Sequence, residues 1–71
     1  MRFDYSLLLL KIQEVYDSTS VFAKDLGISL KSLDNRLFNV TQWKSCEIAK
    51  ACDLLKIPVK DADLYFFTAL N

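Results

Sequence analysis

Two cysteines are the most reactive side chains in this sequence, and their spacing limits what they can do. Cys46 and Cys52 lie on one predicted helix, about 9 Å apart along its axis and about 240° apart around it. They cannot form a disulfide within that helix, and two cysteines in a chain without histidine are too few for a structural zinc site. We therefore expect buried, reduced thiols, an intracellular protein and no bound metal.

Two carboxylates, Asp61 and Asp63, are close enough in sequence to suggest acid–base chemistry. The chain has no histidine to act as a base beside a serine or cysteine, and its single glycine cannot form a glycine-rich phosphate loop. This pair is more typical of a helix start, where negative charge favours the helix dipole. The sequence predicts no enzyme, no catalytic residue and no cofactor.

The composition indicates a small helical domain. The chain has 71 residues, 52% of them hydrophobic, with one glycine and one proline. Tight turns and β-rich folds use more of both residues, so we expect an all-α fold, a compact bundle of about five short helices forming one domain over residues 1–71. The leucine run at 7–10 is far too short to span a membrane, and we expect a soluble, cytoplasmic protein.

Net charge bears on the class of partner. Nine basic residues balance nine acidic ones. Proteins that bind nucleic acids usually carry a positive surplus, because neutralised phosphates supply most of the binding energy. A local basic patch can serve without a net surplus, so neutrality disfavours DNA binding without excluding it.

Hydrophobic periodicity places five helices along the chain. The predicted spans are Tyr5–Tyr16, Thr19 or Ser20 to Leu26, Leu30 to about Phe38, Lys44 or Ser45 to Leu55, and Asp61 to about Phe67. On the first helix the side chains expected to face the core are Tyr5, Leu8, Ile12, Val15 and Tyr16. On the fourth they are Ile48, Ala51, Cys52 and Leu55, and on the last they are Leu64, Tyr65 and Phe67. Trp43 precedes the fourth helix, where it can staple onto Glu47 or Ile48.

The second and third helices are joined by a short turn with Gly27 at the position where positive φ is needed, followed by Ser29 as a cap. This is the helix-turn-helix pattern. Ala23 is small enough to let the two helices pass closely. The side chains expected to fill the space around this motif are Phe22, Leu26, Ile28, Leu33 and Leu37.

The stretch "FAKDLGIS" at 22–29, followed by "SL" at 32–33 and "RL" at 36–37, resembles the helix-turn-helix of phage Cro and repressor proteins. The stretches "FDYS" at 3–6, "EIAKACDLLKIP" at 47–58 and "YFFTAL" at 65–70 extend the resemblance to small Cro-type regulators of temperate phages of Gram-positive bacteria. Length and pattern are most similar to the modulator-of-repression type of anti-repressor from lactococcal phages. That resemblance implies a role in the lytic–lysogenic decision, inside a bacterial host cell.

In such regulators the third helix enters the major groove. Carried onto this chain, the candidate contact residues are Ser29, Leu30, Lys31, Asp34 and Asn35, with Phe38 also facing outward. Lys31 suits guanine or phosphate and Asn35 suits an adenine edge, whereas Asp34 would repel phosphates. Arg36, where many members have an apolar residue, is expected at the protein's margin.

Two uses of this surface are open. An apolar centre with mixed charge is typical of a protein–protein interface; alternatively, Phe38 packs under the following loop and Leu30 is half-buried. Trp43 is more typical of a core residue than of an interface residue.

The resemblance implies an anti-repressor that binds the N-terminal DNA-binding domain of the phage's CI-type repressor and alters or blocks its operator binding. Operator DNA would then be contacted weakly or within that complex. The alternative is a Cro-like repressor that binds operator DNA directly as a dimer. A structural or toxin–antitoxin interaction module without a DNA role is a more distant possibility.

Overall fold

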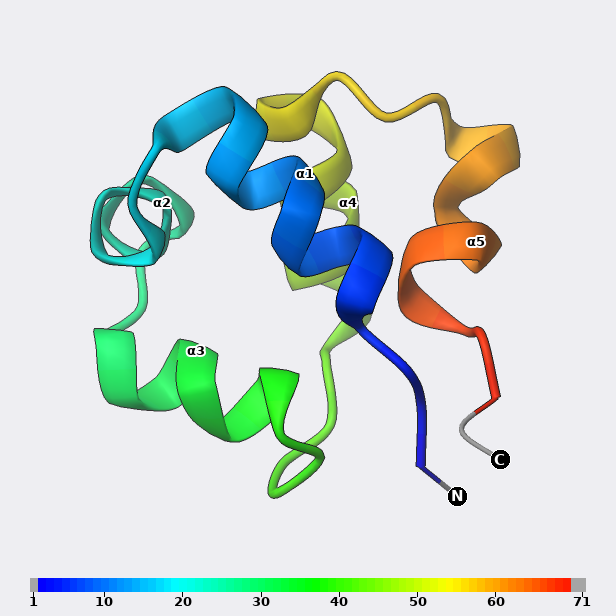
Figure 1. Ribbon diagram of the computed structural model, residues 1–71, viewed down its shortest axis with the longest axis horizontal. Helices are drawn as coiled ribbons and strands as arrows, with labels where there is room; N and C mark the ends of the chain where they lie inside the picture. Colours follow the sequence, from blue (N-terminus) through cyan, green and yellow to red (C-terminus); the bar gives the residue numbers. More distant parts are fainter. Residues whose placement is uncertain (1, 70–71) are drawn as a thin grey trace.

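The structure, a computed structural model, describes residues 2–69 and is all-helical over that range. Its α-helices are α1 (Ser6–Tyr16), α2 (Thr19–Leu26), α3 (Leu30–Leu37), α4 (Ser45–Leu55) and α5 (Ala62–Phe66), with a 3-10 turn, η1, at Val59–Asp61 (Figure 1). The predicted all-α bundle is confirmed. Leu70, the last residue of the "YFFTAL" stretch, lies outside the described residues.

Short polar side chains set where the first three helices begin. Before α1, Asp4 Oδ1 accepts hydrogen bonds from the Ser6 amide at 2.9 Å and the Ser6 hydroxyl at 2.6 Å. Ser18 caps α2 by accepting from the Ser20 amide, and Ser29 caps α3 by accepting from the Ser32 amide at 3.1 Å. Each cap satisfies an amide that the helix itself cannot pair.

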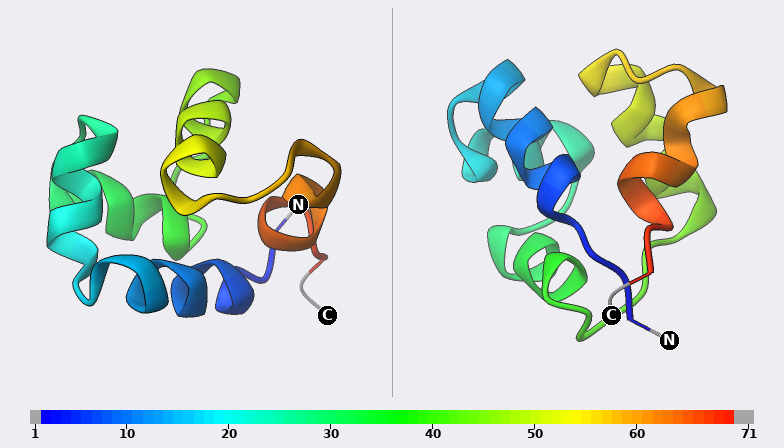
Figure 2. Two further views of the ribbon diagram at one scale, coloured as in Figure 1. Left: turned by 90° about the horizontal axis from the view of Figure 1, so that it is seen from above. Right: turned by 45° about the vertical axis from the view of Figure 1, so that its right-hand side comes forward.

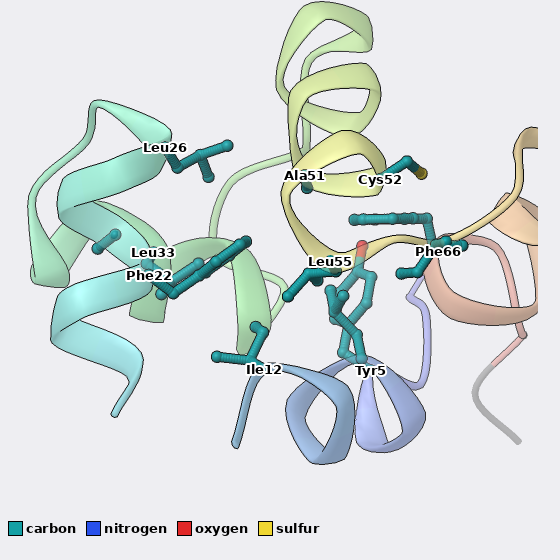
Figure 3. Close-up of a cluster of buried hydrophobic side chains, with 12 residues drawn as sticks. Tyr5, Ile12, Phe22, Leu26, Leu33, Ala51, Cys52, Leu55 and Phe66 are labelled. Carbon is teal, nitrogen blue, oxygen red and sulfur yellow. The ribbon is translucent and has the colours of Figure 1, made fainter. Parts of the chain in front are cut away.

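Buried side chains from every helix meet in one core (Figure 3). The fully or almost fully buried residues are Tyr5, Leu8, Ile12, Phe22, Ala23, Leu26, Leu33, Ala51, Cys52, Leu55, Ile57 and Phe66. Most of the predicted inward faces are therefore confirmed. Several details of the prediction are wrong.

The last helix turns a different residue inward. Phe66 is buried and its ring meets Trp43 edge-on at 5.0 Å between centroids, whereas Leu64 and Phe67 are exposed. The 3-10 turn before α5 winds more tightly than an α-helix, which changes the register of the helix face. Tyr65 packs at the edge of the core.

Val15 and Cys46 are exposed where burial was predicted. α2 covers the last turn of α1 from the side of Tyr16, whose ring lies 5.3 Å from that of Phe22, so Val15 stays outside. Cys46 projects from a different side of α4 than the buried Cys52, and it is exposed because the core contacts only one side of this helix.

The N-terminal segment is fixed between the loop after α3 and the C-terminal segment (Figure 2, right). The Asn39 carboxamide binds both backbone groups of Phe3: its Oδ1 accepts from the Phe3 amide at 2.8 Å, and its Nδ2 donates to the Phe3 carbonyl at 2.9 Å. On the other side, the Asp4 amide donates to the Thr68 carbonyl at 2.8 Å, beside an isolated bridge between Phe3 and Ala69. The loop after α3 is thereby tied to the N-terminal segment, which in turn pairs with the C-terminal segment.

An ion pair fastens α3 to α4. Arg36 donates from Nε to Glu47 Oε1 and from Nη2 to Glu47 Oε2, each at 2.8 Å, and from Nη1 to the Ser32 carbonyl at 2.9 Å. Both side chains are only 12% exposed. A bidentate, largely buried pair of this kind fixes geometry as well as charge. The prediction that Arg36 lies at the margin is wrong, because Glu47 draws its side chain against α4.

The first prediction tests the inner face of α3. Leu33→Ala removes a fully buried side chain and should lower the free energy of unfolding by about 2–5 kcal/mol. Leu37→Ala should cost less, because Leu37 is half-buried. The control Leu30→Ala, on the exposed side of the same helix, should cost less than about 1 kcal/mol. Urea unfolding measures all three; equal losses for Leu33→Ala and Leu30→Ala would contradict this packing.

The second prediction concerns pH. The hydrogen bonds from Arg36 lower the pKa of the Glu47 carboxyl below its ordinary value of 4.5, against the opposing effect of burial. A carboxylate whose folded pKa is lowered stabilises the fold fully above its unfolded pKa, and this contribution disappears as the pH falls through the folded pKa. Glu47→Gln keeps an acceptor for the Lys44 amide but removes the charge. It should cost about 2 kcal/mol near neutral pH and progressively less below pH 4.5.

The control for this experiment is Asp53→Asn, since Asp53 is exposed on the same helix and has no ion pair among residues 2–69. It should leave the unfolding free energy nearly unchanged at every pH. A cost of Glu47→Gln that stays constant down to about pH 3 would show that the ion pair does not stabilise the fold.

Candidate interaction surface on helix α3

The turn between α2 and α3 determines which side of α3 faces outward. Gly27 ends α2 with φ 90°, and its amide and that of Ile28 both donate to the Ala23 carbonyl, at 2.9 and 3.0 Å. A side chain at this φ would be strained, which is why glycine suits the turn. Leu33 then points into the core, with Ile28 and Leu37 half-buried beside it. The opposite side of α3 is left free.

That free side carries the candidate contact residues. Lys31 is exposed, Leu30 is 42% exposed and Phe38, directly after the helix, is 71% exposed. Phe38 therefore does not pack under the following loop. Ser29 is occupied as the cap of α3, accepting from the Ser32 amide and donating its own hydroxyl to Ser32 Oγ. The surface combines apolar and charged groups, as a protein interface does.

Asp34 and Asn35 are half-buried, at the shoulder of this surface. The loop after α3 folds back toward Asn35, whose carbonyl accepts from the amides of Val40 at 2.8 Å and Thr41 at 3.2 Å. Asn35 is thus less open than a freely presented base-reading side chain. Asp34 has no ion pair among the described residues.

The charge that α3 can offer a partner is small. The helix contains two cations, but Arg36 is held by Glu47 and by the Ser32 carbonyl. The other cation, Lys31, has no ion pair among residues 2–69. Its charge is offset by that of Asp34, which also has no ion pair there. The phosphates of a DNA duplex would therefore be attracted only weakly to α3.

A hollow of about 500 Å³ borders this surface on one side. α1 contributes Leu9 and Gln13 to it, and α3 contributes Asp34 and Leu37, with Phe38 beside them. Residues 2–6, Thr19 and Asn39 also line it. Sequence reasoning missed this feature, since no local pattern shows that two sides of separate helices will face one hollow.

Trp43 belongs to the core more than to the surface. Its ring meets those of Tyr5 and Phe66 edge-on, at 6.4 and 5.0 Å between centroids. Its Nε1 is buried and has no hydrogen-bond partner among the described residues.

Burial raises the pKa of the Cys52 thiol, which favours its protonated, unreactive form.

Two further hollows lie elsewhere in residues 2–69, one beside Trp43 and Phe67 and one beside Lys56 and Val59. No group of three or more histidine, cysteine or acidic side chains is arranged there to hold a metal ion. None of the helices in that range is long and apolar enough to cross a membrane. We take the surface of α3 and its adjoining hollow as the candidate site, because the exposed Leu30 and Phe38 lie there.

Residues 1–69 match a family described as "Protein of unknown function (DUF739)". The chain matches no curated protein. It is similar to the solution structure of the modulator of repression (MOR) of the temperate bacteriophage TP901-1 from Lactococcus lactis, with 37% sequence identity and a TM-score of 0.81. The similarity covers 94% of this chain and 90% of that one. Since the family match runs over nearly the whole sequence, the chain belongs to the DUF739 family.

Proposed function

We propose that this protein is a phage transcription regulator that acts in the lytic–lysogenic switch as an anti-repressor. It binds the N-terminal DNA-binding domain of the phage's CI-type repressor and alters or blocks operator binding. The similarity to a modulator of repression from a temperate phage supports a regulatory role of this kind. The surface of α3 supports the choice of a protein as the partner.

The observation that carries the proposal is the combination of side chains on α3. Leu30 and Phe38 expose apolar area, and the unpaired Asp34 carboxylate lies between them in sequence. Exposed apolar area of this kind is typical of an interaction site. A repressor's DNA-reading face is basic because it neutralises phosphates, so an acidic and apolar surface is complementary to it.

The alternative, a Cro-like repressor that binds operator DNA as a dimer, is favoured by one feature. α2 and α3 are joined by a three-residue turn, as in a helix-turn-helix, and Lys31 is exposed on α3. Against it stand the neutral chain, the retention of Arg36 by Glu47, and the repulsion of phosphates by Asp34. We therefore regard direct operator binding as the second candidate.

The third prediction distinguishes the two candidates. The isolated protein should bind operator and random DNA equally weakly at physiological salt. The slope of log affinity against log salt should correspond to few phosphate contacts, at about 0.9 per contact. Fluorescence anisotropy over a salt series measures both quantities. Tight, sequence-specific operator binding by the protein alone would overturn the anti-repressor proposal in favour of the Cro-like one.

The fourth prediction tests the partner surface. Asp34→Lys should weaken binding to the repressor's N-terminal domain by about 2 kcal/mol or more, because it turns attraction into repulsion. The same change should strengthen non-specific DNA binding. Asp53→Lys makes an identical charge change on the exposed side of α4 and serves as the control. Calorimetric titration with the repressor domain that shows no difference between Asp34→Lys and wild type would exclude α3 as the interface.

A further inference from the structure

Residues 2–4 form a strap that is hydrogen-bonded along both of its edges (Figure 2, right). On one edge the Asn39 carboxamide pairs with both backbone groups of Phe3, as a neighbouring strand would. On the other edge the Asp4 amide donates to the Thr68 carbonyl at 2.8 Å. The strap is therefore held from two sides by segments that are far apart in the sequence.

The strap itself contributes little to the core. Arg2 is exposed, and Phe3 and Asp4 are only half-buried. The ring of Phe3 meets that of Phe67 edge-on at 5.7 Å between centroids, but Phe67 is exposed in turn. The next residue, Tyr5, is buried and anchors the start of α1. A segment held by a few neutral hydrogen bonds and few buried side chains opens at a lower free energy than packed helices do.

The strap also separates two hollows. The first, of about 500 Å³, lies between α1 and α3, and the second, of about 440 Å³, is lined by Trp43 and Phe66. Phe3, Tyr5 and Asn39 line both. Phe3 and Asn39 are joined by the two hydrogen bonds of the carboxamide. When these bonds break and Phe3 moves away, the shared wall between the hollows is lost.

We infer that the strap opens as one unit while helices α1–α5 stay folded, and that Asn39 is the latch that holds it closed. Opening joins the two hollows into one groove and gives solvent access to Trp43. Asparagine suits the latch, since Asn39 has φ 63° and asparagine tolerates this left-handed region better than most residues. This conformational device belongs to the free protein and does not depend on the proposed function.

Hydrogen exchange of single amides, followed by NMR, tests the latch. Asn39→Gly removes the carboxamide and keeps a residue that adopts positive φ without strain. The Asp4 amide is the reporter, because its own acceptor, the Thr68 carbonyl, is untouched. Its exchange should become roughly tenfold faster or more, as the loss of two hydrogen bonds implies. The control Gln42→Gly, which removes an exposed carboxamide from the same loop, should leave that rate unchanged.

A reciprocal experiment starts from the other edge. Phe67→Ala removes the ring that meets Phe3. The Phe3 amide is then the reporter, because its acceptor on Asn39 is untouched. Its exchange should also become faster if the strap opens as one unit. The control is Leu64→Ala, since Leu64 is exposed to the same degree on α5, 53% against 52% for Phe67.

The chain's one tryptophan reports whether the hollows join. Trp43 Nε1 is buried and has no hydrogen-bond partner among the described residues, so exchange of its proton measures access of solvent. In Asn39→Gly this exchange should be roughly tenfold faster and should depend little on urea, because opening the strap exposes little surface. The amide of the fully buried Ala51 should exchange only through global unfolding, with a strong dependence on urea.

Three outcomes would overturn the inference. An Asp4 amide unaffected by Asn39→Gly would show that the two edges open independently. Exchange of Asp4 at the rate and urea dependence of Ala51 would show that the strap opens only when the whole protein unfolds. Faster exchange at Asp4 with no change at the Trp43 indole would show that opening does not join the hollows. Circular dichroism of each variant checks that its helices are retained.

Discussion

Helix α3 is eight residues long, which is too short to persist in water unless packing holds it. The orientation of its outer side is set by the contacts that its inner side makes with the core. Leu33 is completely buried, the Gly27 turn sets the approach from α2, and Arg36 fastens the helix to Glu47 on α4. Asn39, just beyond the helix, binds the backbone of Phe3 and fixes the following loop. These contacts fix the orientation of α3, and its outer side is left without a packing role in the fold.

The ion pair between Arg36 and Glu47 also links the stability of the fold to the charge that α3 presents. By engaging the guanidinium, it makes one of the two cations of α3 unavailable for phosphate contacts. Lys31 and Asp34 then nearly cancel each other, so the apolar groups Leu30 and Phe38 dominate what a partner meets. The same interaction that completes the fold thereby makes this surface less suited to phosphate binding, which agrees with the proposed function.

The parts of the fold that could be predicted from sequence are those fixed by local chemistry. Ser18, Gly27 and Ser29 act within a few residues of themselves, and the helix ends they set were found correctly to within a residue or so. The burial of Leu33 follows from periodicity alone. Phe66 was missed because the register of α5 depends on the 3-10 turn and on packing against Trp43, which no local pattern reports.

The candidate site was predicted only in part for the same reason. Its residues on α3 were identified, but Glu47 is 11 residues from Arg36 and Asn39 is 36 residues from Phe3, so these pairings leave no short-range signal. Leu9 and Gln13 join the site only because α1 passes beside α3. Contacts between segments that are distant in the sequence become apparent only in the three-dimensional structure.

The central claim is that the outer side of α3 is a protein-binding surface. The most direct measurement is a heteronuclear NMR titration of the isotope-labelled protein with the N-terminal domain of the repressor. We expect the amide resonances of α3 and Phe38 to shift most, with those of the second half of α4 unchanged. Shifts confined to α4 and α5, with α3 unaffected, would contradict the account.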